Sequence, residues 1–160
     1  LYAVPLPLDF HDEVGNNVML CRRLDLGDVA FFGEYKGQPA GWAGRLPNPL
    51  SLHQFCTRVQ EVLGEDLVEV WDFGPDSVQR VGVVSGSGAS LVEQVAQAGV
   101  DVYLTGELSH SAYRRAKELG LIVVYAGHYA TETVGLQALA DHLAARFALE
   151  TVFLDLPTGA

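Results

Sequence analysis

An imidazole and a carboxylate four residues apart are the first candidates for chemistry in this sequence. His128 and Glu132 follow the apolar run 121–126, which predicts a buried strand, and they precede a helical pattern that runs to Phe147. Side chains four residues apart lie on one face of a helix, so this pair is able to face one divalent metal ion. The same spacing also fits two ordinary surface neighbours. The position is informative, because α/β folds form sites at the carboxyl ends of strands.

Three further polar segments also follow predicted strands. Asp9 ends the apolar run 1–8, which predicts a strand, and its carboxylate either enters a cleft or caps the next turn. The segment 86–88, Gly-Ser-Gly, is either a tight turn or a cradle for a substrate phosphate. Glu107 follows another short strand. Because Glu107, His128 and the glycine segment fall at the same end of the predicted sheet, they indicate a common site.

The remaining histidines and the cysteines are weaker candidates. His11 and His110 lie near Asp9 and Glu107, and each is either a ligand or an exposed side chain. His53 and His142 lie inside amphipathic helices, where we expect surface residues. A Ser-His-Asp triad fits poorly, because the only glycine-flanked serine lacks the GxSxG spacing. Two cysteines, far apart, exclude a zinc finger and predict no disulfide framework.

The order of predicted elements positions these candidates. In the second half, strands are predicted over 78–85, 102–105, 121–126 and 151–156, and helices over 89–98, 109–119 and 131–147. In the first half, helices are predicted over 16–24 and 51–63, and strands over 29–35, 41–46 and 68–71. The β-α-β-α-β-α-β order of the second half predicts an α/β fold with a parallel or mixed sheet and crossover helices.

Composition narrows the function classes. The 160 residues are 49% hydrophobic and 19% charged, which is enough for one sizeable core, as one compact unit or two lobes. The formal net charge of -10 argues against nucleic acid as a partner and fits a protein that binds a cation or a small substrate. Without a membrane-length apolar run or a signal peptide, we expect a cytoplasmic protein and no membrane partner.

Four segments in a fixed order resemble the Nif-three-like family, whose members are often called GTP cyclohydrolase 1 type 2 homologues. These segments are Pro7-Leu8-Asp9, Glu13-Val14-Gly15-Asn16-Asn17, Thr105-Gly106-Glu107 and Gly127-His128-Tyr129-Ala130-Thr131-Glu132. The ending Phe153-Leu154-Asp155-Leu156-Pro157 is also similar to the family. The resemblance covers essentially all 160 residues and is nearest to the short bacterial form.

The resemblance implies a site with two divalent metal ions, Zn, Mn, Fe or Ni, in a protein that assembles as a toroidal homohexamer. It implies that Asp9, His128 and Glu132 are metal ligands, and it leaves Glu107 to orient a water molecule or carry a proton. The family takes further ligands from an adjacent pair of histidines upstream of Asp9, and this sequence contains no such pair. We therefore expect residues 1–160 to correspond to the C-terminal two-thirds of a member.

Two functions of different classes follow from the resemblance. The first is a metal-dependent hydrolase that acts on a nucleotide or a pterin-like small molecule, with the cyclohydrolase activity implied only by the family name. The second is a non-enzymatic, ring-forming metal-binding protein, such as a metallochaperone or a regulatory partner. Self-association is expected in both, because Phe31, Phe32, Tyr35 and Trp42 suggest an exposed apolar surface.

Overall fold

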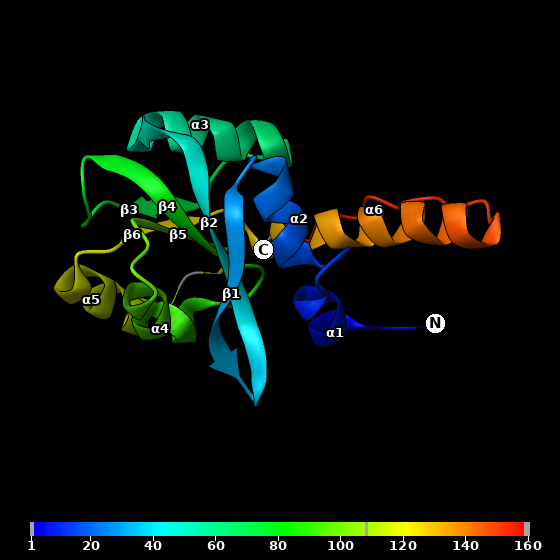
Figure 1. The fold of residues 1–160 in the computed structure, drawn as a ribbon, viewed down its shortest axis with the longest axis horizontal. Coiled ribbons are helices and arrows are strands. Elements are labelled where there is room, and N and C mark those ends of the chain that lie inside the picture. The colour runs from blue at the N-terminus through cyan, green and yellow to red at the C-terminus, as the bar shows by residue number, and fades with distance from the viewer. Residues whose placement is uncertain (1, 108, 159–160) are drawn as a thin grey trace.

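A mixed sheet of six strands is the centre of the computed structural model, which describes residues 2–107 and 109–158 (Figure 1). The strands are β1 Gly27–Tyr35, β2 Gln38–Ser51, β3 Glu69–Trp71, β4 Ser77–Val84, β5 Val102–Thr105 and β6 Ile122–Tyr125. Their order in the sheet is β1-β2-β4-β5-β6-β3. Neighbours β4, β5 and β6 are parallel, and the other neighbouring pairs are antiparallel. The predicted α/β fold with a mixed sheet is therefore confirmed.

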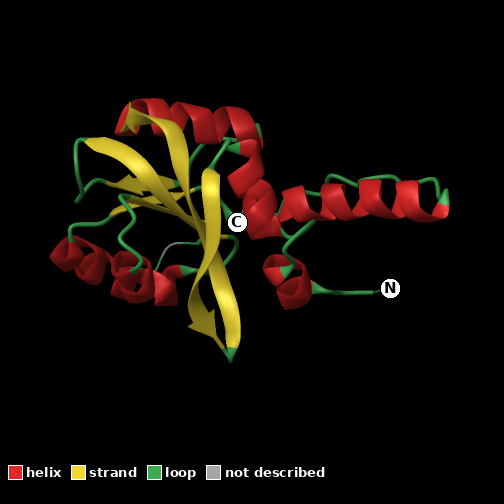
Figure 2. Ribbon diagram, viewed as in Figure 1, coloured by secondary structure: helices red, strands yellow, loops and turns green. Residues whose placement is uncertain are grey.

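Helices cover both faces of the sheet, and one helix projects beyond it (Figure 2). The helices are α1 Pro5–Phe10, α2 Asn16–Arg23, α3 Leu52–Leu63, α4 Val92–Gln97, α5 His110–Leu119 and α6 His128–Phe147, and a short 3-10 helix spans Ala89–Leu91. In Figure 1, α3 lies over one face, α4 and α5 lie over the other, and α6 extends away from the sheet. Within the described ranges, no helix is both long enough and apolar enough to cross a bilayer.

The central strands alternate their side chains between two apolar clusters. Leu104 of β5 and Val124 of β6 belong to the cluster that includes α2 and α3. Tyr103 and Val123, one residue earlier on the same strands, belong to the cluster beneath α4 and α5. Because successive strand residues point to opposite faces, a strand covered on both faces is apolar at every position. This explains why continuous apolar runs predicted these strands correctly.

The boundaries of α3 match the signals in the sequence. The Ser51 hydroxyl accepts a hydrogen bond from the Gln54 amide at 3.3 Å, and the Gln54 side chain accepts one from the Ser51 amide at 2.9 Å. This reciprocal pair is a capping box. Gly64 ends the helix with φ of 72°, in the left-handed region that glycine tolerates.

The prediction of a strand over residues 1–8 is wrong. Residues 5–10 form α1 instead, and Pro5 and Pro7 occupy its first turn. A proline has no amide hydrogen for a sheet ladder, whereas the first turn of a helix leaves that position unpaired. Asp9 therefore lies on a helix, and Leu1 is outside the described residues.

The prediction of a final strand over 151–156 is also wrong, because these residues have no regular secondary structure. The 20-residue α6 carries the chain about 30 Å away from its start, so the residues that follow it lie beside α6 and not beside a strand. The tail then runs back alongside α6 (Figure 1). The hydroxyl of Tyr129 donates a hydrogen bond to Asp155 and accepts one from the Leu156 amide, both at 2.7 Å.

Candidate functional site

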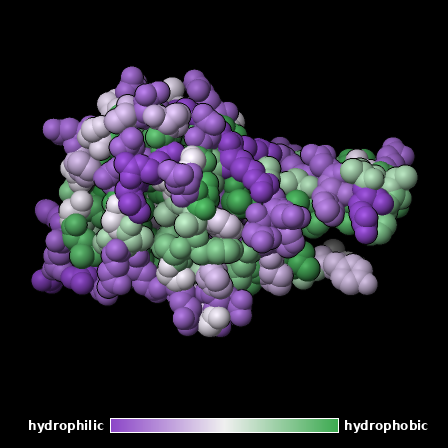
Figure 3. Space-filling view, viewed as in Figure 1, coloured by the Kyte–Doolittle hydropathy of each residue, from purple (hydrophilic) through white to green (hydrophobic). Residues whose placement is uncertain are grey.

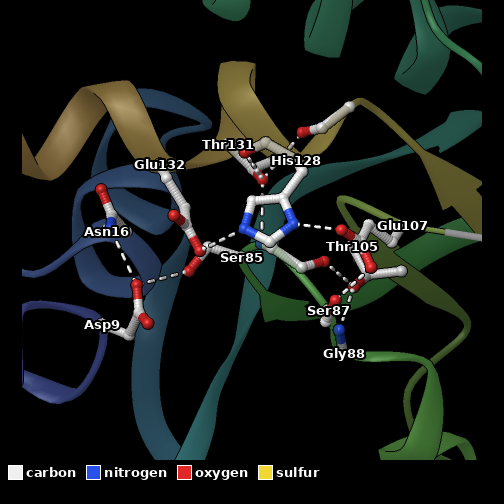
Figure 4. A network of polar contacts seen from close by, with 12 residues as sticks. Asp9, Asn16, Ser85, Ser87, Gly88, Thr105, Glu107, His128, Thr131 and Glu132 are labelled. Atoms are coloured by element: carbon white, nitrogen blue, oxygen red, sulfur yellow. Dashed lines mark hydrogen bonds and ion pairs between the residues drawn. The ribbon is translucent and has the colours of Figure 1, made fainter. Parts of the chain in front are cut away.

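His128 lies between two carboxylates at the start of α6 (Figure 4). Its Nε2 is 3.0 Å from Oε1 of Glu132, one helical turn further along. Its Nδ1 contacts Oε1 of Glu107, which follows β5. The imidazole is 34% exposed, so the ring is supported by protein and still open to solvent. The structure thus brings together three of the predicted site residues.

Glycines allow the ends of β4, β5 and β6 to meet closely at this point. The amides of Gly106 and Glu107 both donate to the carbonyl of Gly86 at 3.0 Å, and the Gly127 amide donates to the Gly106 carbonyl at 3.1 Å. A Cβ on Gly106 would stand 2.8 Å from that Gly86 oxygen, closer than real side-chain contacts allow. The predicted convergence of Glu107, His128 and the glycine segment at one end of the sheet is therefore confirmed.

The Gly86-Ser87-Gly88 segment is a tight turn. The Gly86 amide donates to the Thr131 hydroxyl at 3.0 Å, and the Gly88 amide donates to the Thr105 hydroxyl at 3.2 Å. The Ser87 hydroxyl donates to the Glu107 carboxylate. Because two of the three residues have engaged amides and a carboxylate lies beside the third, the geometry argues against a phosphate cradle.

Asp9 lies on the opposite side of Glu132 from Glu107, buried between helices. Its Oδ1 accepts hydrogen bonds from Nδ2 of Asn16 at 2.8 Å and from the Ser85 hydroxyl at 3.1 Å (Figure 4). Asn16 also accepts a hydrogen bond from the Gly135 amide of α6 at 2.8 Å. One amide side chain therefore connects α1 to α6.

Asn17 makes a second connection beneath Asp9. Its side chain donates to the Asp9 carbonyl at 3.1 Å and accepts from the Ser85 amide at 2.6 Å. Both asparagines belong to one of the segments that resemble the family, but nothing in the sequence alone assigned them a role. The adjacent pair of amide side chains at the start of α2 was the only signal in the sequence, and it does not reveal that both side chains are buried.

Two cavities meet at His128 and Glu132. The first has a volume of about 250 Å³ and is lined by Asp9, His128, Glu132 and Ser87 among others. The second has a volume of about 450 Å³ and lies between α6 and the C-terminal tail. Asp9 and Glu107 each line one of the two. The pair on α6 is therefore accessible from both sides.

The surroundings of the three carboxylates shift their pKa values in different directions. Burial raises the pKa of Asp9, and burial together with the charge of Asp9 raises the pKa of Glu132. Hydrogen bonds from Ser87 and His128 lower the pKa of Glu107. For His128, burial opposes protonation, but the hydrogen bond to Glu107 and the charges of both glutamates together raise its pKa. The site therefore favours positive charge at its centre.

The other histidines do not reach this site. His11 is exposed, and its Nδ1 accepts hydrogen bonds from the amides of Glu13 and Val14 at 3.1 and 3.2 Å. His110 is exposed at the start of α5. His53 and His142 are exposed as predicted, on α3 and α6.

The chemical types of Asp9, His128 and Glu132 fit a divalent metal ion. Carboxylate oxygens with an imidazole nitrogen suit Zn, Mn, Fe or Ni. In the described ranges, however, no three such side chains already converge on one point. His128 and Glu132 contact each other, and Asp9 is held by Asn16 and Ser85. A metal would have to replace the contact between His128 and Glu132.

Comparisons with known proteins agree on one family. The family described as Duf34/NIF3 (NGG1p interacting factor 3) matches residues 1–159. The chain is 44% identical over 159 residues to a protein of Deinococcus radiodurans named GTP cyclohydrolase 1 type 2 homolog, covering 99% of this chain and 60% of that protein. A protein of the same name from Pyrococcus abyssi is 43% identical, with 99% and 63% covered. The chain thus spans less than two thirds of these relatives.

Solved structures share the fold. The protein ybgI, described as of unknown function, is 36% identical with a TM-score of 0.88, and the similarity covers all of this chain and 63% of that one. Reduced HcgD from Methanocaldococcus jannaschii is 30% identical with a TM-score of 0.77, covering 94% of this chain and 58% of that one. From the family match, the sequence identity and the shared fold, this chain belongs to the Duf34/NIF3 family.

Proposed function

We propose that this chain contributes Asp9, His128 and Glu132 to a divalent-metal centre, and that the whole protein is a metal-dependent hydrolase. The observation that carries the proposal is the placement of His128. Its Nδ1 is held by Glu107, and its Nε2 is directed at Glu132, 3.0 Å away, beside a cavity that Asp9 also lines. Metal-binding histidines are typically fixed in this way, with a carboxylate on the second ring nitrogen.

The electrostatics support a cation at this point. Asp9 and Glu132 are both partly desolvated, and the charge of Asp9 disfavours the ionised form of Glu132. A divalent cation between them removes that repulsion and stabilises the ionised forms. A second ion requires ligands beyond these three, so we propose that the two-ion centre belongs to the intact protein.

In the proposed hydrolysis, the metal and the residues around it would have different roles. A bound divalent metal supplies Lewis-acid polarisation and neutralises developing negative charge. Glu107 holds the imidazole of His128 in one orientation and keeps Nδ1 occupied. The Ser87 hydroxyl fixes the second oxygen of that glutamate. Because its pKa is lowered, Glu107 is ionised at neutral pH and acts as an acceptor, which suits orientation of a ligand or of water.

Metal titration followed by turnover tests the proposal. Calorimetry of this chain with manganese and with zinc should show a single weak site, and the longer protein should bind two ions. The metal-loaded longer protein should then hydrolyse at least one compound in a panel of nucleotides and pterins. No metal binding by either protein refutes the proposed centre, and tight binding without turnover refutes the hydrolase.

The apolar surface favours a second candidate, a ring-forming metal-binding protein without catalysis. Figure 3 shows apolar surface over β1 and β2, and further apolar side chains at the far end of α6. Phe31 is 45% exposed, and Phe147 at the end of α6 is 61% exposed. The expected surface is smaller than the sequence suggested, because Phe32 and Trp42 are buried in the core. We propose self-association through this edge of the sheet, with the homohexamer of the family as the assembly.

Light scattering tests this second candidate. Replacing Phe31 with lysine places a charge on the edge strand and should reduce the assembled fraction. Val68→Lys is a matched control, because Val68 is also exposed and lies away from β1. A wild-type monomer at high micromolar concentration would contradict self-association.

A further inference from the structure

Asn16 connects the three proposed metal ligands although it is not one of them. It lies at the start of α2 and is 3% exposed. Its Nδ2 donates to Oδ1 of Asp9 on α1, and its Oδ1 accepts from the Gly135 amide on α6, both at 2.8 Å. One buried side chain therefore contacts the carboxylate of one proposed ligand and the backbone of the helix that carries the other two.

The amide group of Asn16 has only one orientation that fits both neighbours. A carboxylate accepts hydrogen bonds and a backbone amide donates them, so the NH2 group must face Asp9 and the oxygen must face Gly135. The reverse orientation would place oxygen against oxygen and N–H against N–H. The two hydrogen bonds therefore hold the Asp9 carboxylate in one position relative to α6.

These contacts use one oxygen of Asp9 and leave the other. Both hydrogen bonds to its carboxylate, from Asn16 and from the Ser85 hydroxyl at 3.1 Å, end on Oδ1 (Figure 4). Among the described residues, no donor makes a hydrogen bond to Oδ2. Asp9 also lines the same cavity as His128 and Glu132. Oδ2 is therefore the oxygen that Asp9 can offer to a cation.

The contact at Gly135 lies on the face of α6 that carries the proposed ligands. His128, Glu132 and Gly135 are spaced by four and three residues, so they lie on one face of the helix. A Cβ on Gly135 would stand 2.5 Å from Oδ1 of Asn16 and 2.8 Å from its amide nitrogen, so only glycine lets the two helices come this close. The contact with Asn16 therefore sets where this face lies relative to α1.

We infer that Asn16 is a positioning residue of the proposed metal centre. It holds Oδ1 of Asp9, which leaves Oδ2 for the metal, and it keeps that carboxylate in register with His128 and Glu132. Replacing a residue that orients a metal ligand through a hydrogen bond typically weakens metal binding by about ten- to a hundredfold. The inference rests on the proposed function, because Asn16 positions Asp9 for a metal only if that centre exists.

A double-mutant cycle on zinc affinity separates positioning of Asp9 from a purely structural role. Asn16→Ala should weaken zinc binding, measured by calorimetry, by about tenfold in the wild-type background. In an Asp9→Ala background, where the side chain to be positioned is absent, the same change should weaken it by less than about twofold. The urea midpoint should fall in both backgrounds, because the bond to Gly135 is lost in both. A tenfold loss of zinc affinity in both backgrounds, or in neither, overturns the inference.

Ser85→Ala provides a second measurement that leaves α6 untouched. The Ser85 hydroxyl donates to the same oxygen of Asp9, so its removal should weaken zinc binding by about threefold. Val59→Ala is the control, because Val59 is fully buried on α3 and lines neither cavity at His128. It should lower the urea midpoint and leave zinc affinity unchanged. Weaker zinc binding in Val59→Ala would mean that affinity simply follows stability, which contradicts a positioning role.

Gly135→Ala tests the contact with α6. The added Cβ should displace Asn16 and weaken zinc binding by about tenfold, although all three proposed ligands remain. The variant that combines Gly135→Ala with Asn16→Ala should bind zinc no more weakly than Asn16→Ala alone, since both changes break the same contact. Losses that add in the combined variant would show that the two residues act separately.

The wild-type titration separates this inference from the proposed function. Zinc binding that responds to His128→Ala but not to Asn16→Ala refutes the positioning role and leaves the metal centre standing. Absence of zinc binding by the wild type refutes the centre, and the positioning role with it.

Discussion

The two glutamates that flank His128 differ in almost every physical respect. Glu107 is more exposed, both of its oxygens accept hydrogen bonds, and its pKa is lowered. Glu132 is less exposed, and burial with the charge of Asp9 raises its pKa. Both oxygens of Glu107 are hydrogen-bonded by the protein, whereas Glu132 is paired with His128 alone and its charge is opposed by burial and by Asp9.

This difference separates a supporting group from a ligand. A carboxylate whose oxygens are occupied by a serine and an imidazole can orient the ring but has little left to offer a cation. A carboxylate destabilised by burial and by a second carboxylate gains most from a cation. On this comparison, Glu132 is the metal ligand and Glu107 is the residue that orients His128.

The largest expected effect is the loss of metal affinity when a proposed metal ligand is replaced. His128→Ala and Glu132→Gln should each lower manganese and zinc affinity by about a hundredfold or more, because the first removes a nitrogen ligand and the second removes the charge of a carboxylate ligand. His142→Ala, an exposed histidine on the same helix, should leave the affinity unchanged. Elemental analysis that finds wild-type metal content in both ligand variants would show that the ligand assignment is wrong.

A smaller loss of metal affinity is expected when Glu107, the residue that orients His128, is replaced. Glu107→Gln keeps the shape of the side chain but weakens its hold on Nδ1 of His128, so metal affinity should fall about tenfold. Glu118→Gln is the control, since Glu118 is paired with arginines on α5 and lies away from the cavities at His128. If Glu107→Gln abolishes metal binding as fully as Glu132→Gln does, the two glutamates are equivalent and the comparison fails.

A substitution in the turn at Gly86 tests how much room the site has for an added Cβ. Gly86 has φ of 58°, and a Cβ there would overlap the Glu132 carboxylate and stand 3.0 Å from Nε2 of His128. Gly86→Ala should lower the free energy of unfolding by more than the 1–2 kcal/mol or so of left-handed strain alone. Gly37→Ala isolates that strain, because Gly37 has φ of 78° and open space around it. Chemical denaturation that gives equal losses for both variants would mean that the site adjusts freely.

The smallest effect is the pH dependence of the pair between Glu107 and His128. The raised pKa of His128 gives a stabilisation that is complete below its ordinary value of 6.5 and is lost as pH rises through the raised value. The lowered pKa of Glu107 also stabilises the folded state. This second stabilisation is complete above the ordinary pKa of 4.5 and is lost as pH falls through the lowered value. The gap in Tm between wild type and Glu107→Gln should therefore be widest between pH 4.5 and 6.5.

Glu118→Gln again provides the control for that experiment. The pKa of Glu118 is lowered by Arg114 and Arg115, which keep their charge across this range. Its gap in Tm should persist above pH 7, whereas the gap for Glu107→Gln should narrow there. Parallel behaviour of the two variants would mean that His128 does not carry the pH dependence. Both gaps should shrink in high salt, because both pairs are partly exposed.

Local patterns predicted the scaffold well and the two ends of the chain badly. Apolar runs at 102–105 and 121–126 were sufficient for β5 and β6, because strands buried on both faces have no polar positions. The runs at 1–8 and 151–156 look the same, but one contains two prolines and the other follows a helix that leads away from the sheet. An apolar run forms a strand only if the tertiary structure places another strand beside it, and the local sequence does not show this.

The candidate site was likewise predictable only in part. The meeting of Glu107 with His128 followed from parallel strands, which end at the same edge. The roles of Asn16 and Asn17 did not, because they depend on α1 and α6 lying against one another. The cavity lined by Phe153 was also invisible in the sequence, since it requires the tail to turn back 20 residues after His128.

The long α6 has a mechanical consequence. His128 and Glu132 occupy its first turns, the bond from Gly135 to Asn16 holds it to the body near one end, and the exposed Phe147 lies at the other end. A stiff rod held near one end acts as a lever: a sideways displacement of the free end tilts the short end in the opposite direction, reduced in proportion to its length. A partner bound at the tip of α6 would therefore act through a long arm on the turn that carries His128.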